Sequence, residues 1–189
     1  MLESRTTLPE PEAIVKLAAT PAGFALKFIV GFALLMGVFE ASRGTAFERF
    51  LVEDLILVPT TSLINVISPD EHVELIGRTI SSPHSSLRIT RGCEGVEMFL
   101  MLVAGILAFP ASLKRRVHGL WIGSILAYVL SVGRIIALHF ILRYSPTAWE
   151  ALHGLVLPLA PIIVMALYFM RWSAGGTKTT PAAPEAHAA

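Results

Sequence analysis

Cys93 is the only cysteine of the chain, and it stands in the stretch RGCEGVEMFL, where a polar segment gives way to a long apolar one. A helix N-terminus or a nearby cation lowers the pKa of a thiol and so favours the nucleophilic thiolate. Two later residues could work with this thiol: Arg134 near the end of one apolar run, and His153 at the start of the next. A histidine can serve as the base for a cysteine, and an arginine can stabilise an oxyanion or orient a substrate. These residue types suit cysteine-based acyl transfer, if the fold brings them together.

The residues around Cys93 are candidates for contact with a substrate. Gly92 and Gly95 would let a substrate backbone approach the thiol closely, and Arg91 would place a cation beside it. Glu94 and Glu97 oppose that cation. They are candidate substrate-binding residues too, or else first-turn charges that the helix dipole favours.

Each of the three main residues also has a simpler explanation. A free cysteine is often a small buried hydrophobe, and Arg134 could extend its charge to the lipid headgroups. An arginine inside a membrane is costly, however, and indicates a functional site by default. His153 could be an interfacial residue without a role. His139 is a rival for the role of base, but it lies about a turn further out than Arg134, where it could simply be solvated.

The composition indicates an integral membrane protein. Of the 189 residues, 54% are hydrophobic and only 15% are charged, with a mean hydropathy of +0.67. A soluble domain of this size cannot bury so much apolar surface. The net charge of +1, with no basic stripe, argues against a nucleic acid as partner. The first twenty residues, with Glu3, Glu10 and Glu12, do not resemble a cleavable signal peptide.

The pattern of apolar runs predicts an all-α membrane protein with about four transmembrane helices, because a span takes about 20 apolar residues. The predicted spans are residues 24–41, 94–110, 118–138 and 154–171, inside a membrane catalytic domain of residues 23–172. Residues 42–92 form an extracytoplasmic segment, in which residues 50–67 favour an interfacial helix and residues 72–90 weakly indicate a short β-hairpin. Residues 1–22 are a cytoplasmic tail, and residues 173–189 are a disordered cytoplasmic tail.

The orientation follows from one short basic loop. Lys114, Arg115 and Arg116 lie between the second and third predicted spans, and short basic loops stay in the cytoplasm. Both termini are then cytoplasmic. Cys93, Arg134 and His153 all come to the outer face at one depth, since Arg134 lies about sixteen residues into a helix that rises about 1.5 Å per residue.

Taken together, these residues resemble the exosortase/archaeosortase family, and the compact arrangement of four spans is similar to that of its small exosortase H-type members. The resemblance covers residues 89 to about 170. It is carried by the Gly92-Cys93-Glu94-Gly95 turn that opens a span, by Arg134 followed by Ile135, and by His153 opening the next span. The family usually has serine in place of Glu94, and often asparagine in place of Ser131, so the subfamily stays open.

The resemblance implies a cysteine peptidase or transpeptidase with Cys93 as nucleophile, His153 as base and Arg134 as third member. It implies no cofactor and no metal. It also implies a multi-pass protein of the bacterial cytoplasmic (inner) membrane whose active site faces the periplasm. Its partners would be the bilayer and membrane-anchored proteins whose C-terminal sorting signal has a short motif, one transmembrane helix and a basic cluster.

A different class of protein also fits the sequence. A non-enzymatic subunit or scaffold of a polysaccharide or protein export system would use Arg134 to pair with a partner's span. A small transporter is a third possibility, although four spans with one buried charge offer little for a substrate pathway. The sorting motif, the acyl acceptor and the oligomeric state stay open.

Overall fold

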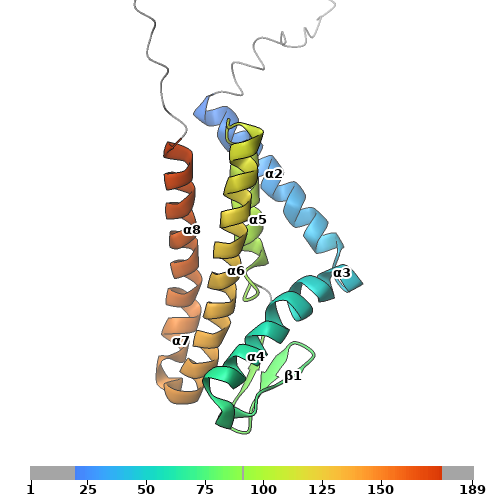
Figure 1. Cartoon of the computed structure of the whole chain (residues 1–189), viewed down its shortest axis with the longest axis vertical. Coiled ribbons are helices and arrows are strands. Elements are labelled where there is room, and N and C mark those ends of the chain that lie inside the picture. The colour runs from blue at the N-terminus through green and yellow to red at the C-terminus, as the bar shows by residue number, and fades with distance from the viewer. Residues whose placement is uncertain (1–19, 91, 176–189) are drawn as a thin grey trace, which may run out of the picture.

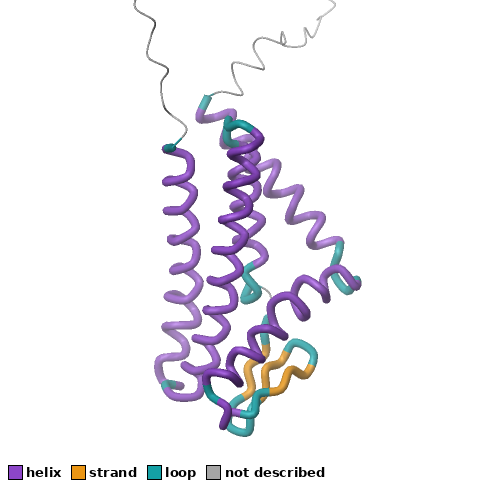
Figure 2. Tube along the Cα trace, viewed as in Figure 1, coloured by secondary structure: helices purple, strands orange, loops and turns teal. Residues whose placement is uncertain are grey.

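The computed structural model describes residues 20–90 and 92–175. Most of the two predicted tails, residues 1–22 and 173–189, and the candidate substrate-binding residue Arg91 lie outside the described residues. The described chain is mostly helical, with one small sheet at one end (Figures 1 and 2). Its elements are, in chain order, α2 (Pro21–Ala41), α3 (Ala46–Arg49), η1 (Phe50–Leu57), α4 (Val58–Ile67), η2 (Pro69–Glu71), β1 (Glu74–Ile76), β2 (Thr79–Ser81), β3 (Ser86–Arg88), α5 (Val96–Ala108), α6 (Leu113–Tyr144), η3 (Pro146–Ala148), α7 (Trp149–Ala151), η4 (Leu152–Val156) and α8 (Leu157–Ala174).

Four helical segments are long and apolar enough to cross a membrane, so the predicted number of spans agrees with the structure. The segments themselves differ from the prediction: Ala46–Ile67 qualifies with 22 residues, whereas residues 94–110 contain only the 13 residues of α5. At about 1.5 Å per residue, α5 is about 20 Å long and shorter than a bilayer core of about 30 Å. Cys93 therefore does not open a full-length span.

The predicted basic loop is part of a helix. The 32-residue helix α6 begins at Leu113, so that Lys114, Arg115 and Arg116 all belong to its first turn. Positive charge there is unfavourable to the helix dipole, but two of these side chains satisfy carbonyl groups of neighbouring segments. Arg115 donates to the carbonyl groups of Trp172 and Ser173 at the end of α8, and Arg116 donates to Phe109 O at 3.0 Å.

The two ends of the helix bundle carry different structures (Figure 1). The start of α2, the α5–α6 connection and the end of α8 lie together at one end. The sheet, η2 and the turn between α6 and α8 lie at the opposite end, and the α3–η1–α4 segment slopes across toward the sheet. The three basic residues at the start of α6, the start of α2 and the end of α8 are thus on the side opposite the sheet, which agrees with the orientation expected from the positive-inside rule. The orientation in a membrane stays a prediction.

Where one hairpin was predicted, the structure has a three-stranded antiparallel sheet in the order β1-β2-β3. Strands β2 and β3 pair around the Ser/Pro turn, with Ile80 opposite Leu87. A second turn joins β1 to β2, and Gly77 supplies the positive φ of 60° that it requires. This second turn was not expected from the sequence. Both Ile80 and Leu87 are buried against the helices.

Two π-helical segments, in which a hydrogen bond spans five residues, each end just before a proline. In η1 the N–H of Val58 donates to Glu53 O, five residues earlier, and Pro59 follows. In η4 the N–H of Leu157 donates to Leu152 O, and Pro158 follows. A proline ring clashes with the carbonyl group four residues before it and lacks a donor, and such π-helical turns often occur at functional sites.

Two hydrophobic clusters hold the described chain together. One lies along the middle of the bundle, where α5, α6 and α8 meet, and its centre is Ile106, which is fully buried. The other lies under the sheet, between it and the helices η1, α4 and α6, and it includes Cys93. Cys93 is therefore packed as a core residue as well as placed in a turn.

Candidate active site

The structure brings the thiol of Cys93 beside the imidazole of His153. The Sγ atom lies 3.8 Å from His153 Nε2, within hydrogen-bonding range for sulfur. Thr90 Oγ1 also lies 3.8 Å from the Sγ atom. The Cys93 residue is only 6% exposed. This pair has the geometry in which a base can take the thiol proton.

His153 is held by its own helix. It lies in the widened segment η4, between α7 and α8, in a helical run that begins before it. The prediction that His153 opens the fourth span is therefore wrong by about one turn, because the helix continues through η4 back to Trp149. The Trp149 ring stacks on the imidazole with centroids 4.8 Å apart and an interplanar angle of 14°. This stacking fixes the imidazole plane beside the thiol.

Cys93 lies in a turn bounded by two glycines with left-handed backbone. Gly92 has φ 78° and Gly95 has φ 80°, a region that side chains with a Cβ rarely adopt. A Cβ on Gly95 would also overlap the hydroxyl of Ser131 on α6. Both glycines are thus required by the turn itself. Gly95 is also required where the start of α5 approaches α6.

Arg134 supports the same turn and lines a cavity. Its Nη1 donates to Gly92 O at 3.0 Å, and its Nε is buried without a hydrogen-bond partner among the described residues. The cavity has a volume of about 280 Å³. Gly92, Gly95 and Glu97 also form part of its wall. A cation with free donor capacity therefore faces a space bounded by the turn that carries the thiol.

Glu94 and Glu97 have different surroundings. Glu97, in the first turn of α5, is exposed and lines the cavity with Arg134. Glu94 is 6% exposed, and its Oε2 accepts the Gly92 N–H at 3.1 Å. Burial raises the pKa of Glu94, while Arg78 and the Gly92 N–H act in the opposite direction. Glu94 thus holds the turn, and this contact differs from the substrate contact predicted from the sequence.

His139 lies in a separate polar cluster. It is completely buried, so the expectation that it is solvated is wrong. Its Nε2 lies 3.6 Å from Glu71 Oε2, and Arg143 Nε donates to Glu71 Oε1 at 3.1 Å. Burial acts to raise the pKa of Glu71, but the hydrogen bonds from Arg143 and Ser82 outweigh it and keep the pKa below its usual value. The structure thus pairs His139 with a carboxylate and His153 with the thiol.

A second cavity, of about 270 Å³, borders the Arg134 cavity and shares Met98, Met101 and Ile162 with it. Its other lining residues are apolar residues of α2, α5 and α8, among them Phe24 and Phe169. Neither Cys93 nor His153 lines either cavity, so the first cavity reaches the turn that carries the thiol at Gly92 and Gly95. In the described part of the chain, no group of three or more His, Cys, Asp or Glu side chains is placed to hold a metal ion.

Comparisons with known proteins add no identification: no family model, curated protein or solved structure matches the chain. The function is therefore inferred from the geometry of the site.

Proposed function

We propose that the protein is a membrane-embedded cysteine peptidase or transpeptidase. It cleaves the C-terminal sorting signals of exported proteins at the outer face of a bacterial cytoplasmic membrane. The observation that carries this proposal is the 3.8 Å contact between Cys93 Sγ and His153 Nε2, made by residues 60 positions apart in the chain. A cysteine packed only as a core residue would have no need of an imidazole that is itself held in place by a stacked indole ring.

The chemistry follows from these groups. His153 takes the thiol proton, and the Cys93 thiolate attacks the carbonyl carbon of the scissile peptide to form a tetrahedral oxyanion. The imidazolium then gives the proton to the leaving amine as the carbon–nitrogen bond breaks, which leaves a thioester on Cys93. Water or an amine attacks the thioester, releasing the acyl group as an acid or an amide and regenerating the thiol.

Arg134 stabilises the oxyanion in this scheme. Its Nη1 is engaged with Gly92 O, while its unpartnered Nε leaves donor capacity for a substrate. A fixed charge in a water-poor site stabilises a developing oxyanion more than water does. Gly92 and Gly95, on either side of Cys93, form part of the wall of the cavity that Arg134 lines, so a substrate bound in this cavity would lie beside the turn that carries the thiol.

The apolar second cavity supports a membrane-anchored substrate. A peptide that lies between α2 and α8 would contact Phe24, Met101 and Phe169. Such a wall suits the apolar anchor of an exported protein. The bilayer then keeps the scissile bond at the depth of the thiol.

The function can be tested with an Arg134→Lys variant. Lysine keeps the positive charge but lacks the planar guanidinium group, whose separate N–H groups can donate to Gly92 O and to the oxyanion at the same time. We expect kcat/KM to fall by about 100-fold, the usual loss when one oxyanion donor is removed. The measurement co-expresses the variant with a tagged exported protein from the same genome that ends in an apolar span and a basic cluster. Loss of that span is followed as a change of size on a gel.

Arg143→Lys is the matched control, because Arg143 lies on the same helix but bonds Glu71. We expect near-normal processing by this variant. Near-normal processing by Arg134→Lys would contradict the role of Arg134. No processing by the unaltered protein of any such substrate would favour the export-scaffold alternative, in which Arg134 pairs with a partner's span.

A further inference from the structure

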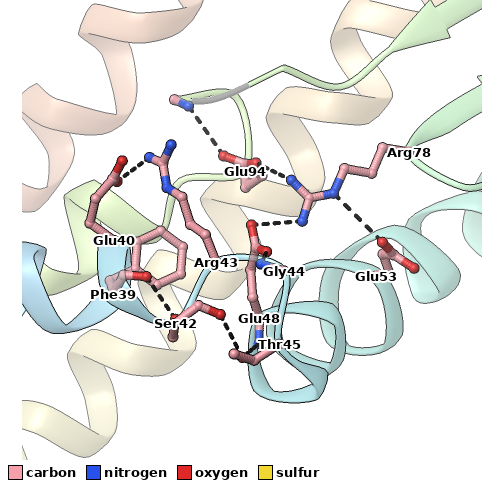
Figure 3. Close-up of polar contacts among 11 residues, drawn as sticks. Phe39, Glu40, Ser42, Arg43, Gly44, Thr45, Glu48, Glu53, Arg78 and Glu94 are labelled. Carbon is pink, nitrogen blue, oxygen red and sulfur yellow. Dashed lines mark hydrogen bonds and ion pairs between the residues drawn. The ribbon is translucent and has the colours of Figure 1, made fainter.

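One guanidinium group joins three separate parts of the chain beside the candidate active site (Figure 3). Arg78 lies in the turn between β1 and β2. Its Nη2 lies 2.8 Å from Glu48 Oε1 in α3, and its Nε lies 3.6 Å from Glu53 Oε1 in η1. Its Nη1 lies 3.7 Å from Glu94 Oε1, next to Cys93. Of these four residues, only Glu94 was expected from the sequence to lie at the candidate site.

The three contacts use three different nitrogen atoms of the guanidinium group. A planar fork can meet three carboxylates in three directions, whereas a lysine ammonium is a single point charge. Glu48 also accepts the Gly44 N–H at 2.6 Å, which ties the end of α2 to the same cluster. The group therefore fixes the sheet, the α3–η1 helix and the Cys93 turn relative to one another.

Glu94 passes this restraint to the backbone of Gly92, the residue that precedes Cys93. Its Oε2 accepts the N–H of Gly92 at 3.1 Å, and Arg134 Nη1 donates to the C=O of Gly92 at 3.0 Å. An anion and a cation thus hold the same residue from its two sides. Gly92 has no side chain of its own to resist rotation, so these two bonds set the direction in which Cys93 points.

We propose that Arg78 is a positioning residue for Cys93, acting through Glu94 on the backbone of Gly92. The inference rests on the proposed role of Cys93 as nucleophile. Without Arg78, the buried Glu94 carboxylate loses the cation that lies 3.7 Å from it, and its hold on Gly92 weakens. A displacement of the nucleophile by about 1 Å can cost about 100-fold in rate.

A double-mutant cycle tests this chain of contacts. We expect Arg78→Gln and Glu94→Gln each to lower kcat by about 10- to 100-fold, with KM changed less than about threefold. Because both act through one bond, the double variant should be no slower than the worse single variant. Arg78→Gln combined with Arg143→Gln should instead be additive, since Arg143 bonds Glu71 and is not part of the Arg78 cluster. Arg78→Lys should recover part of the lost rate.

Thiol alkylation gives a readout that does not need a substrate. Cys93 is the only cysteine, so the mass of the intact protein in membranes after iodoacetamide treatment reports its reaction alone. A loosened turn exposes the thiol, and we expect Arg78→Gln and Glu94→Gln to raise the alkylation rate about fivefold or more. Arg88→Gln is the matched control, because Arg88 lies on β3 opposite Thr79, next to Arg78, and it should alkylate at the unaltered rate.

Either of two results would overturn the proposal: additive effects of Arg78→Gln and Glu94→Gln on kcat, or an unchanged alkylation rate in both variants. If Arg78→Gln does not accumulate in membranes, Arg78→Lys replaces it in both measurements, and Glu94→Gln, which keeps the shape of the side chain, remains its partner in the cycle. Processing by a Cys93→Ala variant would instead refute the proposed function. The alkylation comparison would still decide whether Arg78 holds the turn.

Discussion

Cys93→Ala should abolish processing while the protein remains in the membrane. The variant lacks the atom that forms the thioester, and loss of a covalent nucleophile lowers turnover by more than about 10⁴-fold in comparable enzymes. Cys93 is packed in the hydrophobic cluster under the sheet, but removing one sulfur atom should cost only about 1 kcal/mol of stability. Tagged substrates should keep their C-terminal span and remain membrane-anchored, which a gel of substrate sizes shows directly.

Cys93→Ser is the companion variant, because its side chain is similar in size. A hydroxyl is a much weaker nucleophile than a thiolate unless its base is adapted to it, so we expect nearly the same loss. Full processing by Cys93→Ala, with its amount in the membrane confirmed, would mean that the protein is not a cysteine peptidase.

His153→Ala should produce the second largest loss. Its Nε2 lies 3.8 Å from the thiol sulfur, and removal of a general base commonly costs about 10²- to 10⁴-fold. We expect the processing rate, measured per molecule in the membrane, to fall by about 10³-fold. The stacked Trp149 ring loses its partner, but it lies at the edge of the hydrophobic cluster, so the helix should persist.

His139→Ala is the matched control for this experiment. His139 faces Glu71 and is completely buried, so its removal should lower stability and the amount of protein. The rate per folded molecule should fall by less than about 10-fold, since Glu71 keeps its hydrogen bond from Arg143. The opposite pattern, with His139→Ala inactive and His153→Ala active, would place the base on α6 and refute the assignment.

The position of Cys93 connects these expectations. The substrate's scissile bond has to lie next to its own membrane anchor, and a nucleophile in a fixed turn at the start of α5 meets it at a set depth. Since α5 has only 13 residues, this depth need not coincide with the bilayer surface. Positioning of this kind can supply much of a rate enhancement.

The sequence alone was sufficient for local features of the fold. Apolar runs longer than about 18 residues indicate helices that can span a membrane, and α2, α6 and α8 lie where such runs occur. The Ser/Pro turn at residues 82–85 does join two paired strands, β2 and β3, but the single hairpin expected over residues 72–90 is a three-stranded sheet with a further turn. Proline and glycine marked the ends of α5, because neither residue favours a continuing helix.

Composition gave the wrong prediction for two segments whose structure depends on tertiary contacts. Residues 50–67 contain Glu53, Asp54 and Pro59, which favoured an interfacial helix over a span, yet Ala46–Ile67 is long and apolar enough to cross a membrane. Arg78 pairs with Glu53, and a π-helical turn accommodates the proline. The basic residues at the start of α6 were assigned to a loop, but Arg115 and Arg116 find carbonyl acceptors on segments that only the folded bundle brings near.

The candidate site was likewise predicted only in part from the sequence. Residue types and their order in the sequence identified Cys93, Arg134 and His153 as a set that could do chemistry. The tertiary structure decided that His153 rather than His139 lies against the thiol, that Arg134 bonds the backbone of Gly92, and that Glu94 faces Arg78. The physical reason is the separation along the chain over which each kind of interaction acts. Apolarity, helix length and turn residues act within a few positions of the chain, whereas contacts between residues 40 to 60 positions apart depend on how the helices pack.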